Sequence, residues 1–262
     1  MTIKLLSVPP VSRRCWFVWR RNLVVFLKTW RVNFFPPFIE AFLYLTAIGL
    51  GIGTYVQQID GIPYVSFIAP AILAIAVMNS AFFECTYGSY VRMYYMKTFD
   101  AMIATPLSIE DVIAGELLWG ATRSTMYVAI MLPVLGAFGV ISLPLSLLAI
   151  PLAFFGGLLF AGIAMCFTAV VPSIDTLNYP SFLFITPMML FSGTFFPLTI
   201  LPAFLQYIAV AVLPLTHLVA VMRMLTLPAL SWTGVLNLAW MAAAGSIVCL
   251  VSINLMRRRL IV

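Results

Sequence analysis

Composition and hydropathy predict an all-α integral membrane protein with six transmembrane helices. Of the 262 residues, 63% are hydrophobic and 8% are charged, against about 45–50% and about 25% in soluble domains. Six apolar segments are each near the roughly 20 residues that a helix needs to cross a bilayer. All basic residues except Arg223 lie in alternate connections or at the ends of the chain. These observations exclude an ordinary soluble enzyme, a disordered chain and a disulfide scaffold, and they favour one membrane domain over residues 1–262.

The expected spans run approximately over residues 34–55, 63–89, 124–141, 145–171, 179–196 and 233–256. Glu40 is the only charged residue of the first span, and Glu84 is the only one of the second. A charge inside a bilayer is costly, so each acid requires a partner or a wet cavity. Arg31, Arg92 or the basic residues near the N-terminus are candidate partners. A contact with cargo and a proton relay are the alternatives to an ion pair.

Basic residues set the expected orientation. Lys4, Arg13, Arg14, Arg20, Arg21, Lys28 and Arg31 precede the first span, Arg92, Lys97 and Arg123 lie between the second and third, and Arg257–Arg259 follow the last. Positive residues are retained on the cytoplasmic side of a membrane. Both termini and the connection between spans two and three are therefore expected in the cytoplasm. The net charge of +6 indicates orientation and not nucleic-acid binding.

Residues 12–31 predict an amphipathic interfacial helix. At about 100° per residue its basic side chains fall within one arc. The opposite face carries Cys15, Trp16, Trp19, Leu23, Phe26, Leu27 and Trp30. This pattern is typical of a helix that lies in the inner headgroup layer. Two interpretations stay open, a simple positive anchor and a gate past which a lipidic cargo slides.

The connection between spans two and three predicts a short helix followed by a long one. Thr98 is the expected N-cap of a helix that runs to about Ala104, and Pro106 then disfavours helix at the residue before it. Ser108 and Asp111 have the spacing of a capping box.

The long helix is expected to extend beyond the membrane. Ile109 to Ile141 comprises 33 residues, or about 50 Å, whereas the bilayer core is about 30 Å. The first turns, with Glu110, Asp111, Glu116 and Arg123, are therefore expected to project into the cytosol as a stalk. A plain solvated loop is the alternative.

The fifth span and the segment after it are irregular. Pro180, Pro187 and Ser192-Gly193 interrupt the span, which is tolerated where neighbours satisfy the backbone. Residues 197–228 are apolar but are divided by four prolines into pieces too short to span. They predict re-entrant or interfacial helices in the outer leaflet. His217 and Arg223 are the titratable residues of that segment, and packing is the expected role of the histidine.

The sequence contains no motif for catalysis, metal binding or nucleotide binding. The four cysteines, Cys15, Cys85, Cys166 and Cys249, form neither a CxxC nor a Cys/His spacing and are expected to pack as small apolar residues. A G-x-x-x-x-G-K-[ST] phosphate loop, an acidic metal pair and a Ser/His/Asp grouping are all absent from the sequence. We therefore expect no cofactor and no metal on this chain, and an energy source elsewhere.

Three stretches resemble the ABC-2 family of transporter permeases, in particular those that export rhizobial nodulation lipooligosaccharide and related polysaccharides. They are FDAMIATPLSIEDVIAGELLWGATR (99–123), ITPMMLFSGTFFPLTILPAFLQYIAVAVLPLTHLVAVMR (185–223) and the terminal LMRRRLIV. The resemblance implies a bacterial inner-membrane subunit that works as two permeases with two separate ATPases, which bind ATP and Mg²⁺. It also implies that residues 98–112 contain the coupling helix that docks on an ATPase.

Two sets of candidate functional residues follow from this resemblance and from the sequence pattern. The expected ATPase-coupling residues are Thr98, Phe99, Asp100, Ala101, Met102, Thr105, Pro106, Glu110, Asp111 and Glu116. The expected cargo path or gate comprises Trp16, Trp19, Glu40, Tyr44, Glu84, Tyr87, Phe191 and Phe195. The expected cargo is amphipathic, a lipid-linked or acylated saccharide first and a hydrophobic drug second. A second copy of the chain and membrane lipid are the other expected partners.

Two other classes of protein were weighed against a transporter subunit of this kind. A proton-coupled carrier is opposed by the absence of acids in spans three to six and of a visible inverted repeat. A membrane-embedded enzyme is opposed by the lack of a catalytic cluster in the sequence.

Overall fold

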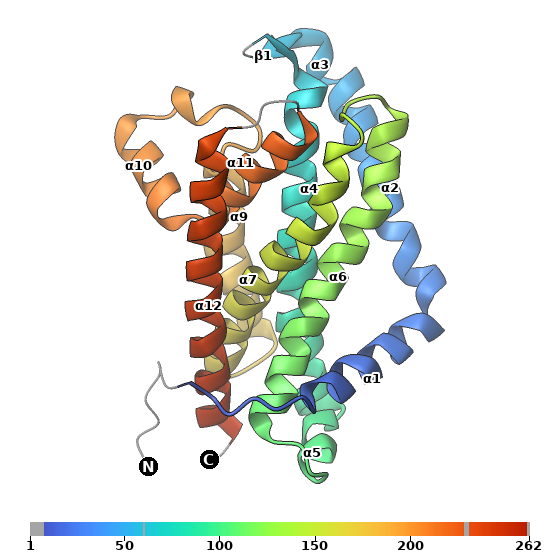
Figure 1. The fold of residues 1–262 in the computed structure, drawn as a ribbon, viewed down its shortest axis with the longest axis vertical. Helices are drawn as coiled ribbons and strands as arrows, with labels where there is room; N and C mark the ends of the chain where they lie inside the picture. The colour runs from blue at the N-terminus through green and yellow to red at the C-terminus, as the bar shows by residue number, and fades with distance from the viewer. Residues whose placement is uncertain (1–7, 60, 228–230, 261–262) are drawn as a thin grey trace.

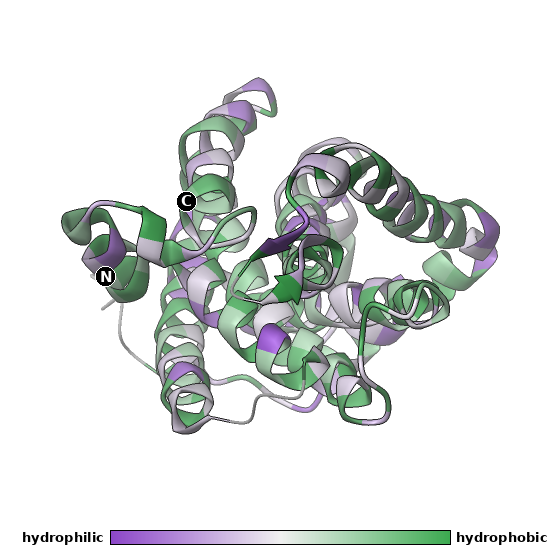
Figure 2. Ribbon diagram, turned by 90° about the horizontal axis from the view of Figure 1, so that it is seen from above, coloured by the Kyte–Doolittle hydropathy of each residue, from purple (hydrophilic) through white to green (hydrophobic). Residues whose placement is uncertain are grey.

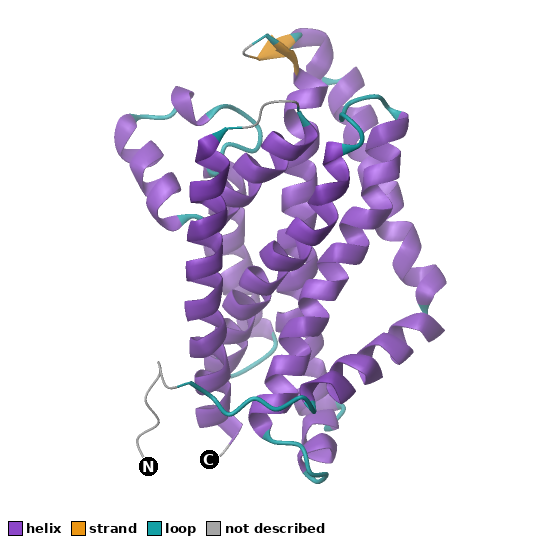
Figure 3. Ribbon diagram, in the orientation of Figure 1, coloured by secondary structure: helices purple, strands orange, loops and turns teal. Residues whose placement is uncertain are grey.

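The structure is a computed structural model that describes residues 8–59, 61–227 and 231–260. These residues are helical apart from one short antiparallel pair of strands, β1 (Gln58–Ile59) and β2 (Ile62–Pro63). Figure 1 shows an elongated bundle in which the C-terminal end of α12 lies at the same end as α5, with β1 and α3 at the other end. Figure 3 shows how little of the described chain is loop. The predicted all-α class is confirmed.

The helices follow one another along the chain with short connections. They are α1 (Cys15–Lys28), α2 (Trp30–Leu50), α3 (Ile52–Tyr55), α4 (Tyr64–Phe83), the π-helical turns η1 (Glu84–Gly88) and η2 (Val91–Tyr95), α5 (Thr98–Ile103), α6 (Ile109–Ala137), η3 (Leu145–Leu148), α7 (Ala149–Val170), η4 (Asp175–Leu177), α8 (Asn178–Pro180), η5 (Ser181–Ile185), α9 (Thr186–Phe191), η6 (Leu198–Ile200), α10 (Ala203–Val212), α11 (Pro214–Thr226) and α12 (Trp232–Leu260).

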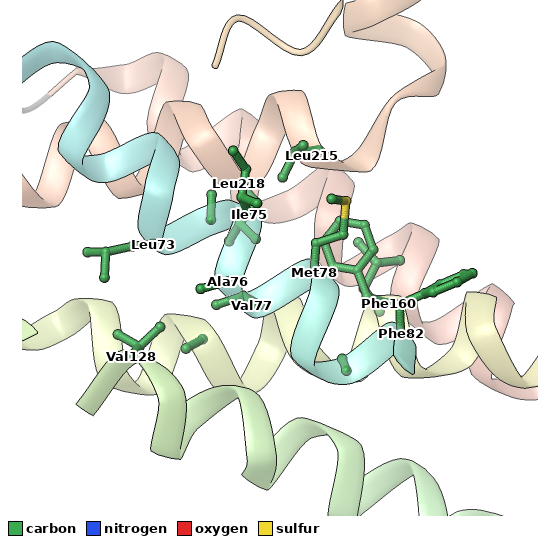
Figure 4. Packing of buried hydrophobic residues seen from close by; sticks show 14 of the residues in the cluster. Leu73, Ile75, Ala76, Val77, Met78, Phe82, Val128, Phe160, Leu215 and Leu218 are labelled. Carbon is green, nitrogen blue, oxygen red and sulfur yellow. The ribbon is translucent and has the colours of Figure 1, made fainter. Parts of the chain in front are cut away.

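Helix α4 forms the centre of the bundle. It packs against α6, α7 and α11, and most of its side chains are buried. Figure 4 shows Val77, Met78 and Phe82 of α4 facing Phe160 of α7 and Leu218 of α11. Helices α2 and α12 lie at the periphery and are largely exposed. Figure 2 shows that hydrophobic residues also cover these outer helices. An apolar exterior of this kind is suited to lipid contact.

Four helical segments are long and apolar enough to cross a membrane, namely Trp30–Tyr55, Tyr64–Tyr95, Leu145–Val170 and Trp232–Leu260. They match four of the six expected spans. Residues 124–141 lie largely within α6, but that helix also carries Arg123 and several polar residues, which lower its hydropathy. Residues 179–196 are divided among α8, η5 and α9, each of which is too short to span. The expected number of six spans is therefore met only in part.

Helices α10 and α11 meet at an angle of 86°. The bend lies at Leu213 and Pro214, and the proline occupies the first turn of α11, where its missing N–H costs no hydrogen bond. Helix α11 is buried against α4 and α12, whereas α10 is mostly exposed. A bent apolar pair of this kind is a broken span or a re-entrant loop, which agrees with the expectation for residues 197–228. Pro228 lies outside the described residues.

Helix α1 is shorter than the expected 12–31 and docks on α6. Trp16 is 53% exposed, and Leu27 and Trp30 are exposed to a similar extent, so this face is available to lipid as expected. The buried residues belong to a third face that the pattern did not indicate, and they are Val18 and Asn22. Val18 packs closely at Gly115, where a Cβ would lie 2.5 Å from the Cβ of Val18.

Candidate functional site

The short helix α5 forms the tip of the bundle at the end where α12 finishes (Figure 1). A sharp turn precedes it, because Lys97 adopts a left-handed backbone conformation with φ of 52°. The expected N-cap role of Thr98 is wrong. Thr98 is the first helical residue, Lys97 occupies the N-cap position, and no side chain caps the helix.

Helix α5 is held by one face and presents the other. Phe99 is fully buried and Met102 is partly buried, so both anchor the helix to the bundle. Asp100, Ala101 and Thr105 are exposed, as is Pro106 just after the helix. Asp100 lies 3.9 Å from Lys97, and both side chains are more than 60% exposed, so this ion pair contributes little to stability. The residues are therefore free to contact another molecule.

Helix α6 begins with the predicted capping box. Ser108 Oγ accepts a hydrogen bond from the backbone N–H of Asp111 at 3.1 Å, and the backbone N–H of Ser108 donates to Asp111 Oδ2 at 3.4 Å. Asp111 also accepts from the backbone N–H and the hydroxyl of Ser12, at 2.6 and 3.0 Å. Burial alone would raise the pKa of Asp111, but these hydrogen bonds from Ser12 and Ser108 outweigh burial and lower the pKa. Asp111 thus ties the start of the chain to α6.

The side chains of Glu110, Asp111 and Glu116 do not form the exposed surface that a projecting stalk suggests. All three are buried, and Glu116 has no exposed surface. The reason is tertiary, because α1, α5 and the end of α12 pack around the first turns of α6. Glu110, for example, forms an ion pair of 3.1 Å with Arg257.

Four charged residues form a buried network, which we call the ion network: Glu84, Arg92, Glu116 and Arg123. Arg92 Nη1 lies 2.8 Å from Glu84 Oε1, and Arg92 Nη2 lies 2.5 Å from Glu116 Oε2. Arg123 Nη1 lies 3.2 Å from Glu84 Oε2. The indole N–H of Trp119 donates to Glu84 at 2.9 Å. The expectation that Arg92 partners Glu84 is confirmed.

The local backbone explains how this network assembles. Glu84 begins the first of two π-helical turns and Arg92 lies in the second; such turns are rare and occur frequently at functional sites. Gly88 lies between them, and a Cβ there would approach Glu84 Oε1 to 3.2 Å. Glu116 and Arg123 are seven residues apart on α6, so they share one face of that helix.

Helix α1 joins the ion network through an uncharged residue. Asn22 Nδ2 donates to Glu116 Oε1 at 2.8 Å, and Ser89 Oγ donates to Glu116 Oε2 at 2.8 Å. The network therefore links α1, the π-helical turns after α4, and α6. Sequence reasoning did not identify Asn22 or the role of Glu116. One signal was present, because Asn22 is the only amide in α1.

The last turn of α12 contacts the segments that precede and follow α5 in the chain. Arg257 pairs with Glu110 at the start of α6, just after α5. Arg259 lies over the ring of Tyr94, with 5.1 Å between the guanidinium carbon and the ring centroid, and it donates to the Tyr94 hydroxyl at 2.8 Å. Tyr94 belongs to η2, just before α5. These contacts connect the end of α12 to the segments on either side of α5.

The expected path residues on α1 and α2 lie apart from one another. Trp16 and Trp19 stack with ring centroids 4.1 Å apart, and Trp19 Nε1 donates to Thr122 at 2.8 Å. Glu40 and Tyr44 line an open groove of about 800 Å³ along one face of α2. That groove is lined by α2 alone, so it faces outward from the bundle.

The remaining path residues lie at two further places. Glu84 belongs to the ion network, and Tyr87 donates from its hydroxyl to Asn178 Oδ1 at 2.8 Å. Phe191 ends α9 and is partly exposed, while the carbonyl of Phe195 accepts from the Tyr64 hydroxyl at 3.2 Å. The structure of one chain therefore does not gather the eight residues into one site.

No group of three or more histidine, cysteine or acidic side chains in the described part of the chain could hold a metal ion. His217 instead packs and forms hydrogen bonds. Its ring stacks on Trp240 with centroids 4.1 Å apart, Nδ1 lies 2.6 Å from Asn237 Oδ1, and Nε2 lies 2.9 Å from the carbonyl of Val210.

Comparison with known proteins identifies the family. The family described as ABC-2 type transporter matches residues 13–227. Nodulation protein J of Sinorhizobium fredii strain NGR234 is 32% identical over 256 residues, which cover 97% of each chain. Nodulation protein J of Rhizobium leguminosarum bv. viciae is 35% identical over 209 residues, 79% of each chain. The inner membrane transport permease YadH of Escherichia coli K12 is 26% identical over 198 residues, 72% of this chain and 73% of YadH. No solved structure gives a significant match.

The family assignment explains the absence of nucleotide-binding motifs, because ABC-2 permeases pair with separate ATPase subunits. It also agrees with the apolar helices of the structure. The chain therefore belongs to the ABC-2 type transporter family, as a multi-pass membrane permease and a transport subunit rather than an ATPase.

Proposed function

We propose that this chain is the permease subunit of an exporter that moves an amphipathic saccharide, acylated or linked to a lipid, across the bacterial inner membrane. Two copies of the chain work with two ATPase subunits, which bind ATP and Mg²⁺. The similarity to nodulation protein J over nearly the whole chain supports this cargo class. A hydrophobic drug is the alternative cargo, supported only by the broader family.

The observation that carries the proposal is the exposed face of α5. Asp100, Ala101 and Thr105 project from a helix that is anchored by Phe99, and Pro106 follows. We assign this face to ATPase docking, together with Thr98 and Met102. Glu110, Asp111 and Glu116 do not contact the ATPase directly. They are buried and hold α6 to its neighbours. Closure of the ATPases would move α5, and the ion network and α12 would transmit that movement as a rigid-body change.

The single membrane domain of residues 1–262 has, in this proposal, six spans with both termini in the cytoplasm. Helix α6 is the third span and extends beyond the bilayer, because its 29 residues are about 44 Å long. The interrupted segment from α8 to α9 is the fifth span, and the bent pair of α10 and α11 is the re-entrant element on the outer side. Exposed Lys97 and Arg258 lie at the cytoplasmic end, in keeping with the positive-inside rule.

The cargo path lies outside the core of a single chain. Glu40 and Tyr44 face outward from α2, in an apolar groove whose lining includes a second aromatic residue, Phe35. A second copy of the chain could close this groove into a path, with Trp16 and Trp19 at its cytoplasmic entrance and Phe191 and Phe195 toward its exit. Aromatic side chains stack on sugar rings and also accept acyl chains, so such a lining suits an acylated saccharide.

Transport by the reconstituted complex tests this function. The chain is co-expressed with the ATPase of the neighbouring reading frame and placed in proteoliposomes. We expect ATP-dependent transport of a fluorescent lipooligosaccharide, and none with an ATPase that cannot hydrolyse ATP. Transport of hydrophobic dyes without the saccharide lipid would contradict the cargo class. A proton gradient that drives transport without ATP would contradict the mechanism.

A further inference from the structure

A polar cavity of about 220 Å³ lies beside the ion network, between α1, the π-helical turns after α4, and α6. Its lining includes Arg21, Arg92 and Arg123. Thr29 and Asn33 line it at the break between α1 and α2, where Thr29 is exposed. The mechanism proposed above uses Arg92 and Arg123 but gives no role to this space or to Arg21.

The cavity has an excess of positive charge. Three guanidinium groups line it, and the carboxylates of Glu84 and Glu116 offset two of them. Arg21 donates to Asn22 Oδ1 at 2.9 Å and, within the part of the chain that the structure describes, forms no ion pair. Burial and the nearby Arg92 lower the pKa of Arg21, and together they outweigh the opposite effect of Glu116.

A second observation points to a missing acceptor. The Nε of Arg123 is buried and donates to no acceptor among the described residues. A buried N–H without a partner costs about 1–3 kcal/mol, and a bound molecule or ion is one explanation for such a group. Arg123 also lines the cavity. An anionic oxygen in the cavity could accept from Arg21 and from this N–H.

The size and position of the cavity define the occupant. At about 220 Å³ it is smaller than the roughly 300–1,000 Å³ of pockets for drug-sized ligands, so it excludes an oligosaccharide and admits a phosphate group. Trp30, the first residue of α2, follows the cavity residue Thr29 directly and is exposed, and tryptophan is enriched at headgroup depth. Val25 and Met96 also line the cavity and are exposed, which suits the apolar part of a lipid.

We propose that this cavity binds the phosphate of one anionic phospholipid headgroup as a resident lipid of the permease. Arg21 and Arg123 contact the phosphate oxygens, and Arg92 adds charge from behind. Glu84 sets the specificity for a single phosphate, because a more highly charged anion would be repelled. The lipid fills the wedge between α1 and the ion network and holds α1 against α6. The site is separate from the cargo path.

Ligand-dependent thermostability of the purified full chain tests the site. The protein is washed free of lipid in detergent and titrated with dihexanoyl phosphatidylglycerol, dihexanoyl phosphatidylcholine or inorganic phosphate. A ligand that binds the folded state raises Tm as its concentration exceeds Kd. We expect a saturable rise with phosphatidylglycerol and a smaller one with phosphatidylcholine. An equal rise with inorganic phosphate would overturn the lipid assignment, and no rise with any ligand would overturn the site.

Matched variants separate this cavity from general surface charge. Arg20 neighbours Arg21 but is exposed and lies outside the cavity. We expect Arg21→Gln to weaken the apparent affinity for phosphatidylglycerol about tenfold, the loss of one charge-assisted hydrogen bond. Arg20→Gln should leave it unchanged, and Arg21→Lys should retain part of it. Equal losses in Arg21→Gln and Arg20→Gln would overturn the proposal.

A second variant, which removes no charge, keeps the proposal testable if Arg21→Gln fails to fold. Val25 lines the cavity and is about half exposed. Val25→Phe should narrow the cavity and abolish the rise in Tm with phosphatidylglycerol, while the Tm without lipid stays close to that of the parent. Full retention of the lipid effect in Val25→Phe would contradict the assignment.

Discussion

Replacement of Arg92 by methionine tests the ion network. Arg92 contacts two carboxylates, Glu84 at 2.8 Å and Glu116 at 2.5 Å. Methionine has a similar length and no charge, so the variant keeps much of the packing and removes the cation. Glu116 has no exposed surface and Glu84 is 11% exposed. The variant therefore leaves two buried acids close together, with Arg123 as the remaining cation.

The expected loss in free energy of unfolding follows from this burial. Removal of one partner from a buried ion pair costs about 3–5 kcal/mol, because the other charge stays buried without compensation. The variant Glu116→Gln should restore part of this loss, since a neutral amide still accepts from Asn22, which donates to Glu116 at 2.8 Å. The double variant should therefore be less destabilised than the sum of the single variants, by about 0.5–3 kcal/mol.

Equilibrium unfolding in mixed micelles, followed by tryptophan fluorescence, measures these differences. Lys97→Met is the matched control, because its ion pair with Asp100 is 3.9 Å long and exposed. That control should change stability by less than about 1 kcal/mol. The reasoning is refuted if Arg92→Met is no more destabilising than Lys97→Met, or if the two changes at Arg92 and Glu116 are additive.

Three further predictions concern the packing around α5 and α6. Gly115→Ala should lower the free energy of unfolding by about 1–3 kcal/mol in the same assay, because its Cβ would lie 2.5 Å from Val18 Cβ. The control Gly136→Ala, whose nearest neighbour is 4.0 Å away, should leave stability unchanged. Equal effects of the two variants would contradict the docking of α1. Asp111→Asn should be less stable than the parent protein at neutral pH, and the two proteins should become equally stable in acid. The reason is that folding lowers the pKa of Asp111. The stabilisation from its carboxylate is therefore complete above about pH 4 and disappears as the pH falls through the lowered pKa. A stability difference between Asp111→Asn and the parent that grows as the pH falls would contradict this pH dependence. Arg259→Gln should speed hydrogen exchange in α5 and η2, because Arg259 holds Tyr94. The control Arg258→Gln, at an exposed position, should leave the exchange rates unchanged. Equal exchange in both variants would show that the contact between Arg259 and Tyr94 does not stabilise α5.

Local features of this fold were predictable from the sequence, because they depend on neighbouring residues. The capping box of Ser108 and Asp111 and the short helix before it are examples. The N-cap of α5 was not predictable in this way, since Lys97 takes a left-handed conformation that the sequence does not require. The partner of Glu84 was among the expected candidates, because Arg92 lies two turns further along the same segment.

Features that depend on tertiary packing were missed. Helix length placed Glu110, Asp111 and Glu116 beyond the bilayer, but length gives no information on what packs around them. Their burial arises from α1 and the end of α12, which lie about 100 or more residues away in the chain. Likewise, the sequence shows Asn22 only as an uncharged polar residue in an amphipathic helix, whereas in the structure it donates a hydrogen bond to Glu116. The expected path residues are dispersed for the same reason.

The account depends on α5 as the docking site of an ATPase, and one measurement tests this directly. The chain and the ATPase of the neighbouring reading frame are co-purified from membranes, and the bound ATPase and its ATP hydrolysis are quantified for Ala101→Arg and for Gln57→Arg. Ala101 is exposed on α5 and Gln57 is exposed beside β1 at the opposite end of the bundle (Figure 1). We predict loss of the ATPase from Ala101→Arg, with normal membrane insertion, and no loss from Gln57→Arg. Full ATPase binding and normal ATP-driven transport by Ala101→Arg would contradict the account.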